Sequence, residues 1–352
     1  MKVKPLVTVV LVLIVWLSFF KISHAGFLSE IFKFAAKEVV KEVVIESGKN
    51  ILKELLVEDT NRAKLFNKSV NHFENENYSL AVKYMRKSAL LGLTEAKYNL
   101  GFFYQHGYGV EQNWKKAFSW YLKAAKDDFA IAQHDIGVSY YQGNGVDKDY
   151  NASMNWMKKA ANQEYTEAQY SLGIMYYNNE GIRQNLEESV KWHTKAAKNN
   201  TKEASFRSQY NLGWAYETGE GVKKDTRVAA KWYLKAASNN VARSQSQIAG
   251  FFYKGKGIER NYKSAIYWAS KSAEQGSVNG YYWLGMCYEN GNGVKKDLVR
   301  SYQLFILAAK LDKNPVEDRE RVKLKLTKEE RKKGEMLVYE WEKIPRKCFG
   351  CD

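Results

Sequence analysis

The residues of this chain that could support redox or thiol chemistry are few. Three cysteines occur, and two of them, Cys348 and Cys351, form a lone Cys-x-x-Cys in the C-terminal tail. Redox motifs of this kind open a helix in a βαβ context, and no such pattern surrounds this pair. In an oxidising compartment we therefore expect a local disulfide between them. Cys287 stands beside the apolar positions of a helical pattern, which predicts a small residue packed in a core.

Metal and phosphate chemistry find no better support. The histidines that follow residue 25 are His72, His106, His134 and His193. They share no ligand spacing, so no metal site is predicted. The Gly-x-Gly turns of the chain follow helices rather than strands and lack a third glycine in place, so they are not phosphate loops. No Ser/His/Asp arrangement can be singled out. We expect neither a cofactor nor catalysis.

A unit of 36 residues occurs six times in the chain. Any functional site must therefore be built on this repeat. Its landmark is a small residue, and the six landmarks are Gly101, Gly137, Gly173, Gly213, Ala249 and Gly285. A small residue lies five before the landmark, an aliphatic residue one before and an aromatic three after, all on one helix face. Glycine inside a helix costs roughly 1 kcal/mol relative to alanine. The landmark therefore predicts that another backbone approaches closely.

A second helix completes each unit. A Gly-x-Gly-Val or Gly-x-Gly-Ile turn precedes it, with Asn179 replacing the first glycine in the third unit as a residue that tolerates left-handed backbone. Three residues past the Val or Ile stands a predicted N-cap. The predicted caps are Asn113, Asp149, Asn185, Asp225, Asn261 and Asp297. Five of the six second helices then carry Trp, followed by small residues. Two such helices per unit, neither able to bury its face alone, predict an all-α superhelical solenoid.

The pattern AxxxLGxxYxxGxGVxx[DN]xxxAxxWxxKAA resembles the Sel1-like repeat, a relative of the tetratricopeptide repeat. Six full copies cover residues 96–309. The resemblance implies a binding scaffold, with roles such as regulating envelope sensors, engaging host proteins or neutralising a toxin as an immunity partner. A cell-wall or lactam-acting enzyme is the enzymatic alternative, and it would need ionisable groups clustered in one cleft. Some secreted members carry a disulfide in each repeat, and this chain does not.

The flanks of the array have their own patterns. Residues 1–25 resemble a cleaved secretory signal, which predicts a periplasmic or secreted bacterial protein, with an uncleaved anchor as the alternative. Residues 26–58 are amphipathic, broken at Ser47 and Gly48, and form either a cap or a membrane-surface helix over 27–57. Residues 59–95 are predicted to be a degenerate capping repeat. Residues 310–352 are predicted to hold a C-terminal capping helix, opened by a Thr327–Glu330 capping box.

The chain is basic. Its formal net charge is +16, which becomes +13 when three lysines leave with residues 1–25. Such a surface suits an acidic protein partner or an anionic membrane surface. No nucleic acid is expected as a partner of an exported protein. The lysines are spread along the repeats rather than clustered, which favours a solvated solenoid surface. Four extra residues between Ala197 and Ser208 are expected to form a loop, neutral or locally bending the array.

One face of each first helix is richer in aromatic residues than a surface should be. It lies opposite the core stripe, at the positions three before, one after and four after the landmark. The candidate binding residues there are Tyr98, Phe102, His134, Tyr141, Tyr170, Tyr177, Tyr210, Trp214, Tyr253 and Tyr282. Tyrosine and tryptophan with few charges typify interface centres, and first helices line the concave side of solenoids. Packing against the next repeat is the competing interpretation.

Two hypotheses follow. The first is an exported scaffold that binds a protein or peptide along this face, with Tyr170, Tyr177, Tyr210 and Trp214 as its strongest candidates. The second is a membrane-peripheral protein held by residues 27–57 and by its basic charge. The oligomeric state is not encoded in any of these patterns.

Overall fold

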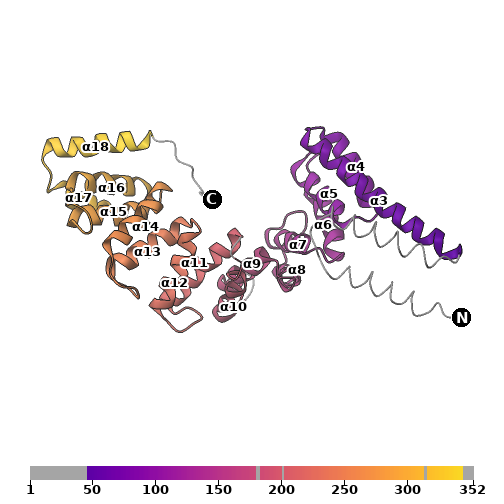
Figure 1. The fold of residues 1–352 in the computed structure, drawn as a ribbon, viewed down its shortest axis with the longest axis horizontal. Helices are drawn as coiled ribbons and strands as arrows, with labels where there is room; N and C mark the ends of the chain where they lie inside the picture. The colour runs from indigo at the N-terminus through magenta and orange to yellow at the C-terminus, as the bar shows by residue number, and fades with distance from the viewer. Residues whose placement is uncertain (1–45, 180–182, 200–201, 313–314, 344–352) are drawn as a thin grey trace. The chain divides into compact units, whose positions relative to one another are not determined.

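The computed structural model describes residues 46–179, 183–199, 202–312 and 315–343, and for residues 46–58 it describes the backbone alone. The predicted signal, residues 26–45 and the Cys348–Cys351 pair lie outside these ranges. The chain forms two compact units that divide after Leu93. The described part is helical throughout and contains no strand (Figure 1). None of its helices is both long enough and apolar enough to span a bilayer.

The first unit contains one helix pair, α3 (Glu46–Glu74) and α4 (Tyr78–Leu90). Two buried serines bind these helices together: Ser69 Oγ donates to the Ala81 carbonyl at 2.6 Å, and Ser88 Oγ donates to the Arg62 carbonyl at 2.7 Å. The helix α3 runs without interruption through residue 58, so the boundary expected between 26–58 and 59–95 falls inside one helix. Ser47 and Gly48, expected as a break, lie in its first turn.

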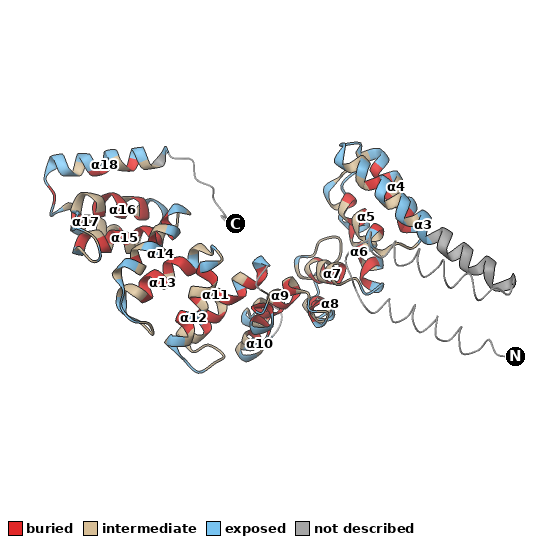
Figure 2. Ribbon diagram, viewed as in Figure 1, coloured by how far each residue is buried: buried red, intermediate tan, exposed pale blue. Residues whose placement is uncertain are grey.

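The second unit holds the six repeats. Their first helices are α5 (Thr94–His106), α7 (Ala130–Gln142), α9 (Thr166–Tyr177), α11 (Glu203–Thr218), α13 (Ala242–Lys254) and α15 (Val278–Asn290). Their second helices are α6 (Trp114–Lys126), α8 (Tyr150–Asn162), α10 (Leu186–Ala196), α12 (Thr226–Ser238), α14 (Tyr262–Glu274) and α16 (Leu298–Leu311). Each helix packs on the next along the chain, as a solenoid requires. The buried residues form a stripe along each helix (Figure 2).

All six predicted N-caps are confirmed, because each Asn or Asp side chain accepts a hydrogen bond from the first turn of its second helix. The first glycine of the turn ends the first helix in left-handed backbone at Gly143, Gly219, Gly255 and Gly291. The third unit differs. There α9 ends at Tyr177, and its C-cap Asn178 is extended rather than left-handed.

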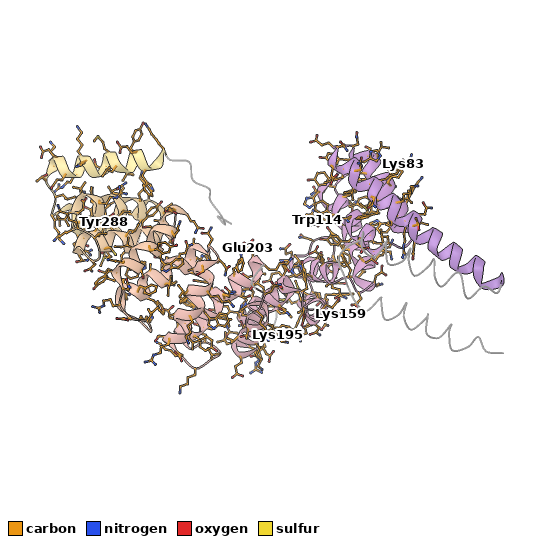
Figure 3. All side chains as sticks on the ribbon, in the orientation of Figure 1. Lys83, Trp114, Lys159, Lys195, Glu203 and Tyr288 are labelled. Atoms are coloured by element: carbon orange, nitrogen blue, oxygen red, sulfur yellow. The ribbon has the colours of Figure 1, made fainter. Side chains whose placement is uncertain are left out.

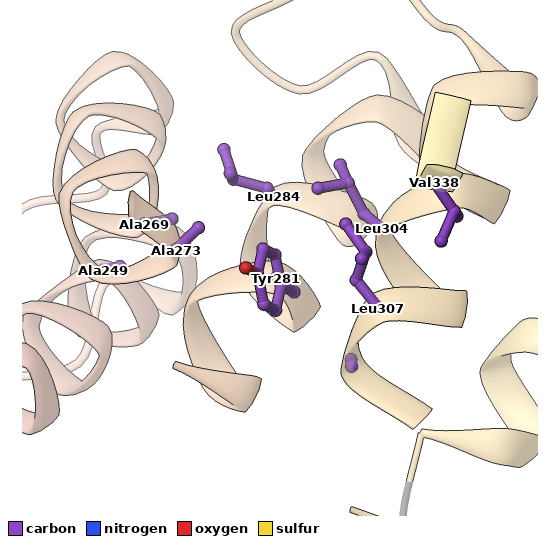
Figure 4. Packing of buried hydrophobic residues seen from close by; sticks show 9 residues of the cluster. Ala249, Ala269, Ala273, Tyr281, Leu284, Leu304, Leu307 and Val338 are labelled. Atoms are coloured by element: carbon purple, nitrogen blue, oxygen red, sulfur yellow. The ribbon is translucent and has the colours of Figure 1, made fainter. Parts of the chain in front are cut away.

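The reason for the landmark glycine is not the one expected. A side chain from the second helix of the same unit, twenty residues on, lies against it rather than another backbone. A Cβ on Gly213 would stand 2.5 Å from the Tyr233 ring, and one on Gly101 would stand 2.7 Å from Tyr121. In the fifth unit the residue twenty positions on is Ala269, and there the landmark is Ala249. Both alanines are fully buried in one cluster (Figure 4).

Close backbone approach occurs instead at the second glycine of the turn. A Cβ on Gly145 would collide with the Trp114 carbonyl, and one on Gly221 with the Leu186 carbonyl. Each of these carbonyls belongs to the start of the preceding unit's second helix. The Gly-x-Gly turn therefore stops one helix and seats the unit on its neighbour.

Buried glutamines join consecutive units in the middle of the array. Gln133, Gln169, Gln209 and Gln245 each donate through Nε2 to a carbonyl within one residue of the end of the preceding second helix, at 3.2–3.3 Å. Three of these carbonyls, those of Ala125, Ala161 and Ala237, also accept a backbone N–H from just past the helix end, so each glutamine adds a hydrogen bond that ties the next first helix to this terminus.

The four extra residues of the fourth unit are mostly helical, which corrects the expected loop. The other five first helices begin seven residues before the landmark, whereas α11 begins at Glu203, ten residues before Gly213. Three of the four extra residues thus lengthen α11, which has 16 residues.

The C-terminal helices α17 (Val316–Lys323) and α18 (Lys328–Glu342) cover the last repeat, and the predicted Thr327–Glu330 capping box is present. Val338 of α18 enters the core cluster that contains Leu304 and Tyr281. The side chain of Glu289 on α15 is 7 % exposed, and its carboxylate accepts from Arg321 Nη2 at 2.6 Å and from Lys325 Nζ at 2.8 Å. An ion-paired carboxylate thus fastens the cap to the array.

We expect Glu289→Gln to lower the free energy of unfolding by about 1–2 kcal/mol, because three charge-assisted hydrogen bonds, two from Arg321 and one from Lys325, weaken while both cations stay half-exposed. Burial alone raises the pKa of Glu289, but hydrogen bonds and charge from Arg321 and Lys325 outweigh burial and lower it. The contribution should therefore be present near neutral pH and vanish as the pH falls through that lowered pKa. Urea unfolding measures it. Glu340→Gln, at an exposed position of α18, is the control and should change stability by less than about 0.5 kcal/mol.

Candidate functional site

The aromatic face divides into two kinds of position. Residues three before the landmark bind the next unit: Tyr98 Oη donates to Asp135 Oδ2 at 2.9 Å, and His134 Nε2 lies 3.3 Å from Ser171 Oγ. Burial and the Asp135 carboxylate raise the pKa of Tyr98 far above its ordinary value. These side chains are half-buried and link consecutive first helices.

Tyr141, Tyr253 and Tyr282 are also engaged within the array. The Tyr141 ring meets Tyr150 edge-on with centroids 5.4 Å apart. Tyr253 Oη accepts from Asn292 Nδ2 at 3.0 Å, and its ring lies 5.4 Å from that of Trp283. Tyr282 packs against the cluster of the last repeat.

Tyr177 and Trp214 are the most exposed residues of this face, each 38 % accessible. They come from the first helices of consecutive units, α9 and α11, and line a cavity of about 330 Å³. Tyr210 lines it as well. Of the four strongest sequence candidates, the structure thus brings three to one cavity. Tyr170 lies outside its lining, with its ring 5.7 Å from that of His193.

The walls and floor of this cavity are mostly apolar and come from three helices. The side chains of Ile174, Leu186, Val190 and Leu212 supply the apolar surface, and His193 of α10 supplies a polar group. The Asn211 amide nitrogen lies 3.1 Å from His193 Nε2, and Ser208 Oγ lies 3.3 Å from Nδ1. Burial lowers the pKa of His193 to about 3, so its imidazole is neutral at physiological pH.

Glu220 supplies the charge of the cavity. Trp214 Nε1 donates to Glu220 Oε2 at 3.3 Å. Burial, and after it the nearby Glu220 carboxylate, raises the pKa of Tyr177. A carboxylate held beside two aromatic side chains suits a basic or amphipathic group of a partner.

Neither Glu220 nor His193 was predicted to line a binding site. Glu220 is the variable residue of a Gly-x-Gly turn, and His193 takes a position that carries Tyr or Met in neighbouring units, so neither stood out from the repeat pattern.

A related cavity of about 260 Å³ lies between α5, α6 and α7. Tyr98 and Phe102 line it, together with Tyr121, Asp135 and the 41 %-exposed Trp114. The surface beside the aromatic face is thus hollowed at two steps of the array.

The described residues offer little support for metal binding or thiol chemistry. Within the described residues no group of three or more His, Cys, Asp and Glu side chains could hold a metal ion. Cys287 is buried, and burial raises the pKa of its thiol to about 12, so it is not a reactive thiolate.

Two solved structures are similar over most of this chain. A Sel1 repeat protein from Oxalobacter formigenes is 29 % identical, with a TM-score of 0.60, covering 70 % of this chain and all of the other. The second is c5321, a protective antigen of uropathogenic Escherichia coli with an SLR fold. It is 25 % identical with a TM-score of 0.54, over 82 % of this chain and 70 % of that one. No curated protein matches.

The sequence model of the Sel1 repeat matches seven segments. They are residues 74–93, 94–129, 130–165, 166–201, 207–241, 242–277 and 278–313. These matches include the six units recognised from their landmarks and the shorter segment before them, and together they span well over half of the chain. With the helix pairs, caps and turns described above, they show that the chain belongs to the Sel1 repeat family.

Proposed function

We propose that this protein is a scaffold that binds a protein or peptide partner across its first helices, with the cavity between α9, α10 and α11 as the anchoring point. Sel1 repeat proteins are generally protein-interaction scaffolds. The observation that carries the proposal is the pairing of exposed Tyr177 and Trp214 over an apolar cavity. Exposed aromatic residues beside a desolvated pocket are the usual centres of binding energy in interfaces.

The size and composition of the cavity suit one anchoring side chain with an apolar stem. About 330 Å³ can hold a long or aromatic side chain, and the apolar floor of Ile174, Leu186 and Val190 would bury its stem. Glu220 at the aromatic side would hold a positive end group. The remaining contacts would come from half-buried residues of the same face, such as Tyr210.

Removal of the two exposed aromatic side chains should abolish partner capture. We expect Trp214→Ala combined with Tyr177→Ala to lower affinity at least about 100-fold, since each anchor residue of an interface contributes on the order of 2 kcal/mol or more. Tyr267→Ala, which removes an aromatic ring 54 % exposed on α14, is the control outside the cavity. Circular dichroism establishes that all variants are folded.

The measurement is capture by the wild-type chain, followed by titration of the captured partner against each variant. If the double variant bound the partner with the same affinity as the wild type, the proposal would be wrong. An equal loss with Tyr267→Ala would place the binding surface elsewhere.

Export through residues 1–25 is part of the same proposal. It places the scaffold in the periplasm or outside the cell, where partners include envelope sensors, host proteins and toxins. The N-terminal sequence of the protein recovered from its native fraction tests it, because cleavage after Ala25 leaves Gly26 as the first residue.

A further inference from the structure

The basic charge of the array is segregated onto its second helices. These six helices contain fifteen Lys and Arg residues and three acids, Glu187, Glu188 and Glu274. The six first helices contain four Lys and Arg residues and six acids. Lysines that are evenly spread along the sequence thus fall mostly on one helix of every pair.

Five of these lysines recur at one position, three residues after the tryptophan of the second helix, and in the first four units the ammonium group lies over the indole ring. The Nζ atoms of Lys123, Lys159 and Lys195 lie 3.7, 4.1 and 3.9 Å from the ring centroids of Trp120, Trp156 and Trp192. The fourth pair, Lys235 over Trp232, is looser at 5.4 Å. We call these four lysines the lysine ladder. Figure 3 labels Lys159 and Lys195 on two consecutive second helices.

Each indole ring orients the ammonium group that lies over it. Packing of a lysine stem on a ring restricts its rotamers before a ligand arrives, so less entropy is lost on binding. The first three ladder lysines are exposed, which leaves their charges accessible. The result is one pre-oriented ammonium group per unit over four consecutive repeats. Such a repeating arrangement suits a polymer whose anionic groups also repeat along its length.

The same pairs argue against a lipid surface as the ligand. Binding to a bilayer by aromatic residues needs rings free to enter the headgroup region. Here the four indole rings are buried or half-buried and each carries its own lysine. At the ladder positions the second helices therefore present charge rather than free rings.

We propose that the second helices bind a linear polyanion that carries phosphate or sulfate groups along a flexible chain, with the lysine ladder as the principal contact. None of the ladder lysines lines the cavity between α9, α10 and α11, so the two proposals stand independently. Several weak contacts along one polyanion act together, because binding of one anionic group raises the effective concentration of the next group at the next lysine.

Long-chain inorganic polyphosphate is the probe. We expect it to bind the full chain much more tightly than tripolyphosphate at equal phosphate concentration. The ladder variant, with Lys123, Lys159, Lys195 and Lys235 each changed to Gln, should lose at least about tenfold in affinity at low salt. In a plot of the logarithm of the binding constant against the logarithm of the salt concentration, the slope of this variant should be shallower by about 3. The reason is that each phosphate that a lysine neutralises on a single-stranded polyanion adds roughly 0.7 to the slope.

The control variant removes the same charge from four exposed lysines of the interhelical turns. It carries Lys223→Gln, Lys224→Gln, Lys295→Gln and Lys296→Gln, and it should bind within about threefold of wild type. An equal loss in both variants would show that net charge alone attracts the polymer. Unchanged binding by the ladder variant would also overturn the proposal, as would equal affinity for tripolyphosphate. Tighter binding to phosphatidylglycerol vesicles than to polyphosphate would make a membrane surface the occupant instead.

Discussion

Replacing Gly213 by alanine should lower the free energy of unfolding by about 2 kcal/mol, although alanine is the better helix former by roughly 1 kcal/mol. The new methyl group would stand 2.5 Å from the Tyr233 ring, and that ring is fully buried. The hydroxyl of Tyr233 is also held, since it donates to Glu217 Oε2 at 2.7 Å. The ring cannot withdraw without breaking this bond, so the clash must strain the helix pair.

The effect of Gly213→Ala on the free energy of unfolding should reverse its sign when the Tyr233 ring is removed. Tyr233→Ala alone should cost about 3–5 kcal/mol as a large core truncation. In that background Gly213→Ala should stabilise the chain by about 1 kcal/mol, because the methyl group fills space and the helix loses a glycine. The chain already contains this combination at Ala249 and Ala269.

The four proteins of this double-mutant cycle are the wild type, the two single variants and the double variant. Urea denaturation monitored by circular dichroism measures the coupling free energy between Gly213 and Tyr233. Ala249→Gly is the reverse control and should cost only the helix-propensity difference of roughly 1 kcal/mol. Additive effects of Gly213→Ala and Tyr233→Ala would show that ring contact does not determine the landmark residue.

Acidification should destabilise the array through His193. Its pKa falls from 6.5 to about 3 in the folded chain because of burial. Between these values the unfolded state binds a proton that the native state excludes, so stability is full above pH 6.5 and decreases below it. The slope reaches about 1.4 kcal/mol per pH unit, or roughly 2 kcal/mol between pH 6.5 and pH 5.

His193→Met isolates this contribution, because Met157 occupies the same position one unit earlier. Other groups also titrate in this range, so the informative quantity is the difference in pH slope between the variant and the wild type. We expect the variant to lose the steep fall between pH 6.5 and pH 5, whatever its stability at neutral pH. Identical slopes would mean that His193 is protonated in the folded chain or stays neutral in the unfolded one.

The repeat pattern by itself determined the helix pairs, their caps and the family. Asn113 and its five equivalents cap their helices because an N-cap depends on a side chain and on backbone donors within three residues of it. The Thr327–Glu330 capping box formed for the same reason. Such local interactions can be read from spacing along the chain.

Only the tertiary structure decided what depends on distances between helices. It showed that Gly213 faces the Tyr233 ring rather than a backbone, that Tyr98 links two units while Tyr177 stays accessible, and that Glu220 lies beside Trp214. A helical period assigns residues to a face, but a helix in a solenoid has neighbours on more than one side. Which part of an aromatic face remains open, and which helices carry the charge, follows from how neighbouring units pack.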